Sequence, residues 1–198
     1  MKPLSHSMAA RTRRVIDRLW LNALCRVFSF DPWHAGAPYS CRPYKCQVVA
    51  LANSVRPVVA VEIGCGLGDI LSRVDACERI GVDSDAGVVR AARFLHPSIA
   101  WIHGDASAAT RFLTDGKTVD CLIMVNWIHA LGEEVLEAIL APLLKRTRYL
   151  IVDSIDPGGP ASYRHKHDFS FLASVAQRIS IERVSGEPRC LLLFKVLG

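Results

Sequence analysis

The sequence predicts an α/β fold in which helices cover both faces of a largely parallel sheet and a β-hairpin ends the chain. Between residues 57 and 178, apolar runs rich in β-branched residues alternate with segments of helical periodicity. A turn with three alternate glycines follows the first apolar run. The last two runs, 179–184 and 190–197, are separated by a short turn alone. These features are typical of successive strand–helix units followed by a hairpin.

The composition indicates one domain preceded by an extension. The chain has 198 residues, of which 51% are hydrophobic, and a formal net charge of +5. This length suffices for one full core but not for two domains of ordinary size. We therefore expect an N-terminal helical extension or lid, residues 1–56, and a main domain, residues 57–198. Much of the positive charge is local, at Arg11, Arg13, Arg14 and Arg18, so we expect no nucleic-acid partner.

Cysteine usage and the absence of long apolar runs predict a cytoplasmic protein without a metal. The chain has seven cysteines, an odd number, and no Cys-x-x-Cys pair. This pattern suits free thiols in a reducing compartment. The nearest two, Cys41 and Cys46, have no second pair with which to bind zinc. No apolar run approaches the roughly 20 residues that span a bilayer, and arginines interrupt the only candidate for a signal-peptide core.

Residues 8–28 have the periodicity of an amphipathic helix. Apolar residues, among them Val15, Leu19 and Leu24, recur at helical spacing, with arginines on the other side. We expect this helix to pack on the sheet or to cover the ligand site. The alternative is a peripheral contact between its basic face and an anionic membrane surface.

The first strand and its glycine turn are the centre of the predicted site. Residues 58–63 form an apolar run that includes Glu62, and Gly64, Gly66 and Gly68 follow it. Glycines at this point permit a tight turn and a close approach of the backbone to a ligand. A helix over 67–75 should then begin at that ligand and favour an anionic group such as a carboxylate. A dinucleotide fingerprint would have glycine where this chain has Asp69. The alternative is a corner whose glycines serve only packing.

The second strand, 79–83, ends on an acid at the distance typical of nucleotide sites. Asp83 lies 19 residues beyond Gly64, where such units place a carboxylate that accepts hydrogen bonds from ribose hydroxyls. Asp85 is better explained as the N-cap of the helix over 87–95.

The pattern Glu-x-Gly-x-Gly-x-Gly at residues 62–68 resembles motif I of the class I S-adenosylmethionine-dependent methyltransferases. The resemblance covers residues 57–198. It implies a Rossmann-like, seven-stranded sheet of order 3-2-1-4-5-7-6, with Glu62 holding the amino group of the cofactor. It also implies that the Gly104-Asp105-Ala106 turn contacts adenine, although Asp105 alternatively caps the helix over 107–113. The expected cofactor-binding residues are Glu62, Gly64, Cys65, Gly66, Gly68, Asp83, Ser84, Gly104, Asp105, Ala106 and Asn126.

In the same resemblance, the end of the fourth strand, Asn126-Trp127-Ile128-His129, lies beside the methionine part of the cofactor and the acceptor. The loop after the fifth strand, which ends at Asp153, adds titratable groups on that side. An alcohol needs a base with a pKa near 7. The candidates for that base, in order, are His167, His165, His129 and His34. The alternative for His165 and His167 is a solvated loop or a cap for a helix over 169–178.

The acceptor is expected to be an oxygen of a small molecule, sugar or glycan. The Asn-Pro-Pro-aromatic signature of many amino methyltransferases is absent at the fourth strand end. The Phe-Asp-Pro-Trp-His segment with Arg-Pro-Tyr looks similar to stand-alone methyltransferases of bacterial surface-polysaccharide pathways. In small methyltransferases this segment borders the pocket, so its wall candidates are Trp33, His34, Tyr39, Arg42 and Tyr44, unless they only anchor the first helix. The alternative functions are an NAD-dependent oxidoreductase and a non-catalytic cofactor-binding module. The oligomeric state is left open.

Overall fold

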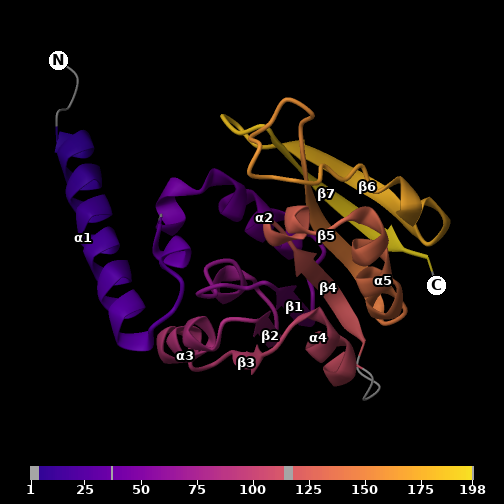
Figure 1. Cartoon of the computed structure of the whole chain (residues 1–198), viewed down its shortest axis with the longest axis horizontal. Helices are drawn as coiled ribbons and strands as arrows, with labels where there is room; N and C mark the ends of the chain where they lie inside the picture. The colour runs from indigo at the N-terminus through magenta and orange to yellow at the C-terminus, as the bar shows by residue number, and fades with distance from the viewer. Residues whose placement is uncertain (1–4, 37, 114–117, 198) are drawn as a thin grey trace.

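The computed structural model describes residues 5–36, 38–113 and 118–197. In these residues a seven-stranded sheet forms the centre of the molecule, in the order β3-β2-β1-β4-β5-β7-β6 (Figure 1). β7 is antiparallel to both of its neighbours, and the other pairings are parallel. The strand order and the C-terminal hairpin predicted from the sequence are therefore confirmed. The strands are β1 (Val59–Ile63), β2 (Glu78–Asp83), β3 (Ala100–His103), β4 (Val119–Met124), β5 (Thr147–Ile155), β6 (Ala176–Arg183) and β7 (Arg189–Val196).

Helices cover both faces of the sheet. α2 (Pro43–Ser54) and α3 (Ala86–Leu95) pack on one face, and α4 (Ala106–Leu113) and α5 (Glu133–Leu144) on the other. α1 (Ser5–Phe28) stands to one side and reaches the body through its C-terminal end, next to α3 (Figure 1). In the described residues, no helix has the length and hydropathy required to cross a membrane.

Two apolar clusters, one on each face, hold the sheet between its helices. On β4, Leu122 and Met124 belong to the cluster under α5, whereas Cys121 and Ile123 belong to the cluster under α2. All four side chains are fully buried. A parallel strand buried on both faces needs a continuous apolar run instead of an alternating one. The sequence of this strand, with its central Cys-Leu-Ile-Met run, meets that requirement.

Two of the predicted helices are wrong. The glycine turn is followed by a short 3₁₀ helix, Leu71–Arg73, instead of an α-helix over 67–75. Gly64, Gly66 and Gly68 all have positive φ, so few residues remain for a helix before β2 begins. The expected helix over 169–178 is a 3₁₀ helix, Ser170–Ser174, followed by β6. Here the pairing of residues 176–183 with β7 prevails over local helical periodicity.

Candidate functional site

A cavity of about 370 Å³ opens at the carboxyl ends of β1, β2, β3 and β4. This volume lies within the range of small-molecule sites, and the carboxyl edge of an open parallel sheet is where such sites form. Ten of the eleven residues predicted to bind cofactor line it. The exception is Gly68, where an added Cβ would lie 2.3 Å from the Trp101 ring. Gly68 thus allows this indole to pack under the turn.

The glycine turn forms the floor of the cavity. Gly64 has a φ of +72°, and a Cβ at this position would lie 2.2 Å from Cδ1 of Trp127. The Trp127 indole is held there because its Nε1 donates to the Ile63 carbonyl at 2.6 Å. On the other side, His34 lies close to Gly66, with Nδ1 3.4 Å from where a Cβ would stand. Glycine at position 64 is therefore required both by backbone conformation and by the Trp127 ring, whereas at Gly66 the positive φ of +55° is the reason, because His34 would be at ordinary contact distance from a Cβ.

Glu62 is buried at the end of β1. Its Oε2 accepts from the Leu71 N–H at 3.2 Å. Burial raises the pKa of the Glu62 carboxyl to about 8, although the Lys45 ammonium opposes this shift. Lys45 is itself paired with Asp69 at 2.6 Å, and all three residues line the cavity. A cation bound beside Glu62 would stabilise its ionised form, as the predicted role toward an amino group requires.

Asp83 connects the end of β2 to the glycine turn. One of its oxygens accepts from the Gly66 N–H at 2.8 Å and the other from the Asp85 N–H at 3.0 Å. Each carboxylate oxygen can accept a further hydrogen bond, and Asp83 lines the cavity. The side chain therefore both shapes the turn and has acceptor capacity left for hydroxyl groups.

Asp85 confirms the predicted N-cap and also secures the N-terminal segment. Its Oδ1 accepts from the N–H groups of Gly87 and Val88, at 2.7 and 3.1 Å. Its Oδ2 accepts from the Asp31 N–H at 3.0 Å. Although burial opposes the shift, these backbone donors, Asp31 first, lower the pKa of the Asp85 carboxyl.

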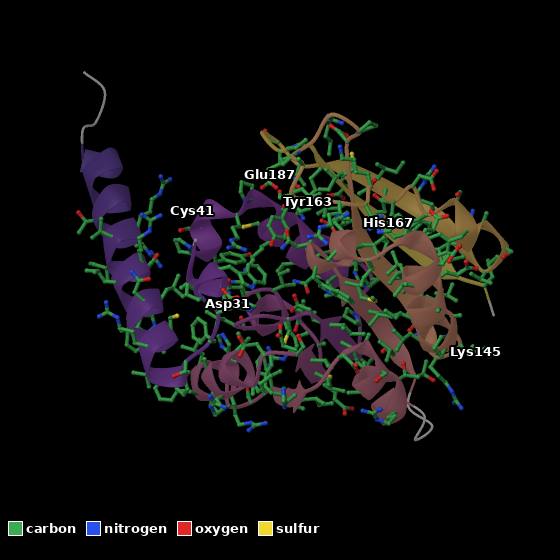
Figure 2. All side chains as sticks on the ribbon, in the orientation of Figure 1. Asp31, Cys41, Lys145, Tyr163, His167 and Glu187 are labelled. Atoms are coloured by element: carbon green, nitrogen blue, oxygen red, sulfur yellow. The ribbon has the colours of Figure 1, made fainter. Side chains whose placement is uncertain are left out.

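The segment between α1 and α2 reaches the cavity, where Asp31 is one of the lining residues; Figure 2 labels Asp31 in this segment. Trp33, His34, Arg42 and Tyr44 line the cavity as predicted wall candidates. Tyr39, the fifth candidate, instead lies beside the Arg73 guanidinium, 3.9 Å from its ring centroid. Burial lowers the pKa of the His34 imidazole, and the nearby carboxylates, Asp83 first, oppose this shift.

Asp105 has the capping geometry that was the alternative to an adenine contact. Its Oδ1 accepts from the Ser107 hydroxyl at 2.6 Å and from the N–H groups of Ser107 and Ala108. The Ser107 hydroxyl is the main cause of the lowered pKa of the Asp105 carboxyl. Only Oδ1 is used in these bonds, and Asp105 borders the cavity. Both roles are therefore compatible with the geometry.

A buried polar network lies behind the far wall of the cavity, around Asn126. The Asn126 N–H donates to Asp153 Oδ1 at 2.8 Å, and its side-chain Oδ1 accepts from Arg189 Nη2 at 3.0 Å and from the Tyr163 hydroxyl at 3.2 Å. Arg189 Nη1 pairs with Asp153, and its guanidinium stacks on Tyr44 at 4.2 Å. Since both donors occupy Oδ1, the amide NH₂ of Asn126 is the group left for the cavity that it lines.

The three leading histidine candidates are not among the described residues that line the cavity. His129 is buried, with Nδ1 3.0 Å from the His165 carbonyl and Nε2 3.3 Å from Asp153 Oδ1. His167 is also buried, with Nε2 3.2 Å from the Ile128 carbonyl, and burial lowers the pKa of its imidazole. His165 is exposed. In Figure 2, Tyr163 and Glu187 lie at the end of the sheet where the Asn126 network lies, and Lys145 lies at the opposite end.

Sequence reasoning missed Lys45 and Arg189. Lys45 stands in α2, where a lysine carries no signal of its own. Arg189 begins a largely apolar strand, and a nearly fully buried arginine at such a position needs a buried carboxylate partner. Asp153 could have suggested that pairing, although β5 continues to Ile155 and does not end at Asp153 as predicted. Among the described residues, no group of three or more His, Cys, Asp or Glu side chains is arranged to hold a metal ion.

Comparison with known proteins establishes the fold. No protein-family model and no curated protein matches the chain. The chain resembles the N-methyltransferase NodS from Bradyrhizobium japonicum WM9, solved with S-adenosyl-L-homocysteine, with a TM-score of 0.69, 16% identity and coverage of 89% of this chain and 98% of NodS. For magnesium protoporphyrin IX methyltransferase (ChlM) from Synechocystis PCC 6803 with bound SAH, the TM-score is 0.64 at 12% identity, covering 79% and 84%. For the mitomycin 7-O-methyltransferase MmcR the TM-score is 0.59 at 15% identity, and the match covers 77% of this chain and 54% of MmcR. The chain thus has the fold of class I S-adenosylmethionine-dependent methyltransferases.

Proposed function

We propose that this chain is an S-adenosylmethionine-dependent methyltransferase. The observation that carries the proposal is the chemistry of the cavity. Six carboxyl groups line it, against the two cationic side chains Arg42 and Lys45. Such a cavity favours a ligand with positive charge and hydroxyl groups over an anionic one. When bound, S-adenosylmethionine supplies a ribose, an ammonium group and an electrophilic methyl group on a sulfonium.

The alternative, an NAD-dependent oxidoreductase, fits this site less well. Dinucleotide enzymes place the pyrophosphate at the N-terminus of the helix that follows the glycine turn. In residues 64–77, all of them described, there are only turns and the 3₁₀ helix Leu71–Arg73. The carboxylates around the turn would also repel a pyrophosphate. The antiparallel β7 between β5 and β6 departs from the dinucleotide-binding strand order as well.

The proposed cofactor residues keep the roles expected from the sequence. Asp83 accepts from ribose hydroxyls, Asp105 and the Ala106 N–H contact adenine, and Glu62 faces the ammonium group. We add Lys45 as a positioning residue. Its ammonium forms an ion pair with Asp69, and its charge favours the ionised form of Glu62.

The acceptor that we propose is a hydroxyl of a small molecule, sugar or glycan. Methyl transfer is an in-line displacement, so holding the acceptor in near-attack geometry supplies most of the catalysis. The Asn126 amide donates toward the acceptor, and the network of Asp153 and Arg189 fixes the orientation of that amide.

We propose a new order for the histidines. His34 lines the cavity and, because burial lowers the pKa of its imidazole, its ring is neutral near pH 7 and able to accept a proton. His129 and His167 are positioning residues through Asp153 and the backbone, and His165 follows them. Replacing His34 by Gln should lower turnover far more than cofactor affinity. Equal losses in both would contradict its role as the base.

The test is calorimetry followed by an activity screen. We expect binding of S-adenosylhomocysteine and no binding of NAD. Asp83→Asn should weaken affinity at least about tenfold, since it removes charged acceptors for the hydroxyls, whereas the exposed Asp75→Asn should not. Labelled S-adenosylmethionine should then transfer its methyl group to a hydroxyl among sugars, nucleotide sugars and lipid-linked glycans. Binding of NAD alone would overturn the proposal. Cofactor binding without transfer to any acceptor in a lysate would favour a binding module.

A further inference from the structure

The helix α1 has two apolar stripes, and the body of the protein covers only one of them. The covered stripe contains Leu21, Leu24, Cys25 and Phe28, which pack in one cluster with residues of α3. These positions recur at intervals of three and four, so they share one face of the helix.

The second stripe faces away from the body. Five large apolar side chains form it, and each is more than half exposed: Val15, Ile16, Leu19, Trp20 and Val27. At 100° per residue they fall within one side of the helix, centred roughly opposite Leu21 and Cys25. Figure 1 shows that α1 stands away from the sheet over most of its length, so no described residue covers this face. An exposed apolar face of this extent marks an interaction surface.

The charges around the stripe identify its partner. Four exposed arginines, Arg13, Arg14, Arg18 and Arg26, stand against one acid, Asp17, over residues 12–28. Arg13 and Arg18 lie on the two edges of the stripe by helical geometry. None of the four arginines forms an ion pair with a described residue. The side chain of Arg11, also part of the predicted basic patch, lies outside the described residues.

We propose that α1 binds the surface of an anionic membrane, with the helix axis parallel to the bilayer plane. Val15, Leu19 and Trp20 then enter the boundary between headgroups and acyl chains, while Arg13 and Arg18 extend their guanidinium groups to lipid phosphates. Trp is a favourable side chain at that depth, because it has an apolar body and a polar N–H. This inference is independent of the reaction catalysed.

A second copy of this chain fits the stripe less well than a membrane does. The helix carries a net charge of +3 over residues 12–28, so two copies that meet through it repel each other. An anionic surface has the opposite effect, since each arginine near it adds to the attraction.

The experiment is flotation of the full chain with vesicles of neutral phosphatidylcholine and with vesicles that contain anionic phosphatidylglycerol. We expect binding to the anionic vesicles that weakens as salt rises, and much weaker binding to the neutral ones. Each arginine near an anionic surface strengthens partitioning about fivefold. Replacing both Arg13 and Arg18 by Gln should therefore reduce partitioning onto anionic vesicles about twentyfold or more. On neutral vesicles this variant should behave as the unmodified chain does.

A matched pair of variants separates the stripe from general surface hydrophobicity. Leu19→Gln with Trp20→Gln should reduce binding about tenfold or more. Val135→Gln with Ile181→Gln, which alters two apolar side chains elsewhere that are also more than half exposed, should leave binding unchanged. Binding of S-adenosylhomocysteine and the thermal midpoint report on the fold of each variant, and the arginine variant tests the proposal even if the apolar variant unfolds.

Three results would overturn the proposal. The first is equal binding to neutral and anionic vesicles. The second is an equal loss of binding in the control pair. The third is a dimer in light scattering that Leu19→Gln with Trp20→Gln converts to a monomer, without any vesicle binding, because it would assign the stripe to a second copy.

Discussion

Alanine substitutions in the glycine turn permit a prediction in which the cost of the backbone conformation and the cost of steric overlap can be measured separately. Three glycines of this chain represent different combinations of those two properties. Gly64 has a φ of +72° and Trp127 Cδ1 2.2 Å from a Cβ. Gly186 has a φ of +77°, with no described atom within 4 Å of a Cβ. Gly158 has neither a positive φ nor a close neighbour. We therefore compare Gly64→Ala, Gly186→Ala and Gly158→Ala.

The expected free energies follow from these surroundings. Alanine in the left-handed region costs about 1–2 kcal/mol, and the lower entropy of the unfolded chain offsets about 0.4–1 kcal/mol of it. Gly186→Ala should thus destabilise by about 1 kcal/mol, and Gly158→Ala should be neutral or slightly stabilising. Gly64→Ala must also displace the Trp127 indole. Losing its hydrogen bond to Ile63 costs about 1 kcal/mol and overpacking costs about 1–3 kcal/mol, which brings the total to about 3–5 kcal/mol.

Thermal unfolding and calorimetry distinguish the three variants. For a chain of this size, 1 kcal/mol corresponds to about 2–4 °C in Tm. We expect a loss of about 3 °C for Gly186→Ala and of about 10 °C or more for Gly64→Ala. Gly64→Ala should also lose S-adenosylhomocysteine binding, whereas Gly186→Ala should retain it because Gly186 does not line the cavity. Equal losses of Tm in Gly64→Ala and Gly186→Ala would refute the reasoning, since they would show that Trp127 moves at no cost.

Two further predictions concern buried charges. Arg189→Met leaves the Asp153 carboxylate buried without its arginine partner, so we expect denaturant unfolding to show a free energy of unfolding lower by about 3–5 kcal/mol. The double variant Arg189→Met with Asp153→Asn should regain a large part of that loss. Losses that simply add in the double variant would contradict the pairing. The pKa of Glu62 is about 8 in the folded chain against an ordinary value of 4.5, so the folded state retains a proton that the unfolded state has lost. Its contribution to the free energy of unfolding should therefore fall as pH rises from about 4.5 to about 8, by up to about 1.4 kcal/mol per pH unit. Glu62→Gln should remove that slope and the exposed Glu134→Gln should not; equal slopes in all three proteins would contradict it.

The sheet could be predicted because its signals are local. Each central strand is an apolar run that ends near a turn residue or an acid, and parallel strands buried on both faces require such runs. The helices predicted over 8–28, 87–95 and 107–113 correspond to α1, α3 and α4, and their signals are local in the same way. The helix expected over 169–178 failed because residues 176–183 pair with β7, which is a contact between segments and not a property of either one.

The cofactor side of the cavity was also accessible from the sequence, because its residues follow directly on strand ends. Glu62, Asp83 and Asp105 stand at the carboxyl ends of β1, β2 and β3, and parallel strands bring these ends to one edge. The position of Asp83 relative to Gly64 then suggested a nucleoside. What the sequence could not reveal was that Asp83 also accepts from the Gly66 N–H, which is a property of the folded turn.

The acceptor side was less predictable because its geometry depends on contacts over long sequence separations. Arg189 reaches Asn126 from 63 residues away and Tyr163 from 26. The place of His167 in the loop after β5 predicts that its ring faces the acceptor. Its ring instead turns inward, where Nε2 lies against the Ile128 carbonyl. Loop position alone does not determine which side chain faces a cavity and which is buried beneath it.

The contacts at the end of α1 connect the proposed membrane helix to the cavity. The Phe28 carbonyl accepts from Arg90 Nη2 at 2.9 Å and would lie 2.7 Å from a Cβ on Gly87, so α1 ends directly on the first turn of α3. That same turn is capped by Asp85, which also accepts from the Asp31 N–H. Asp83 in turn accepts from the Asp85 N–H and from the glycine turn. Each step is a short hydrogen bond or a van der Waals contact, and the first turn of α3 supports them all. The first turn of α3 therefore connects the end of α1 both to Asp31, which lines the cavity, and to Asp83, the residue on which β2 ends.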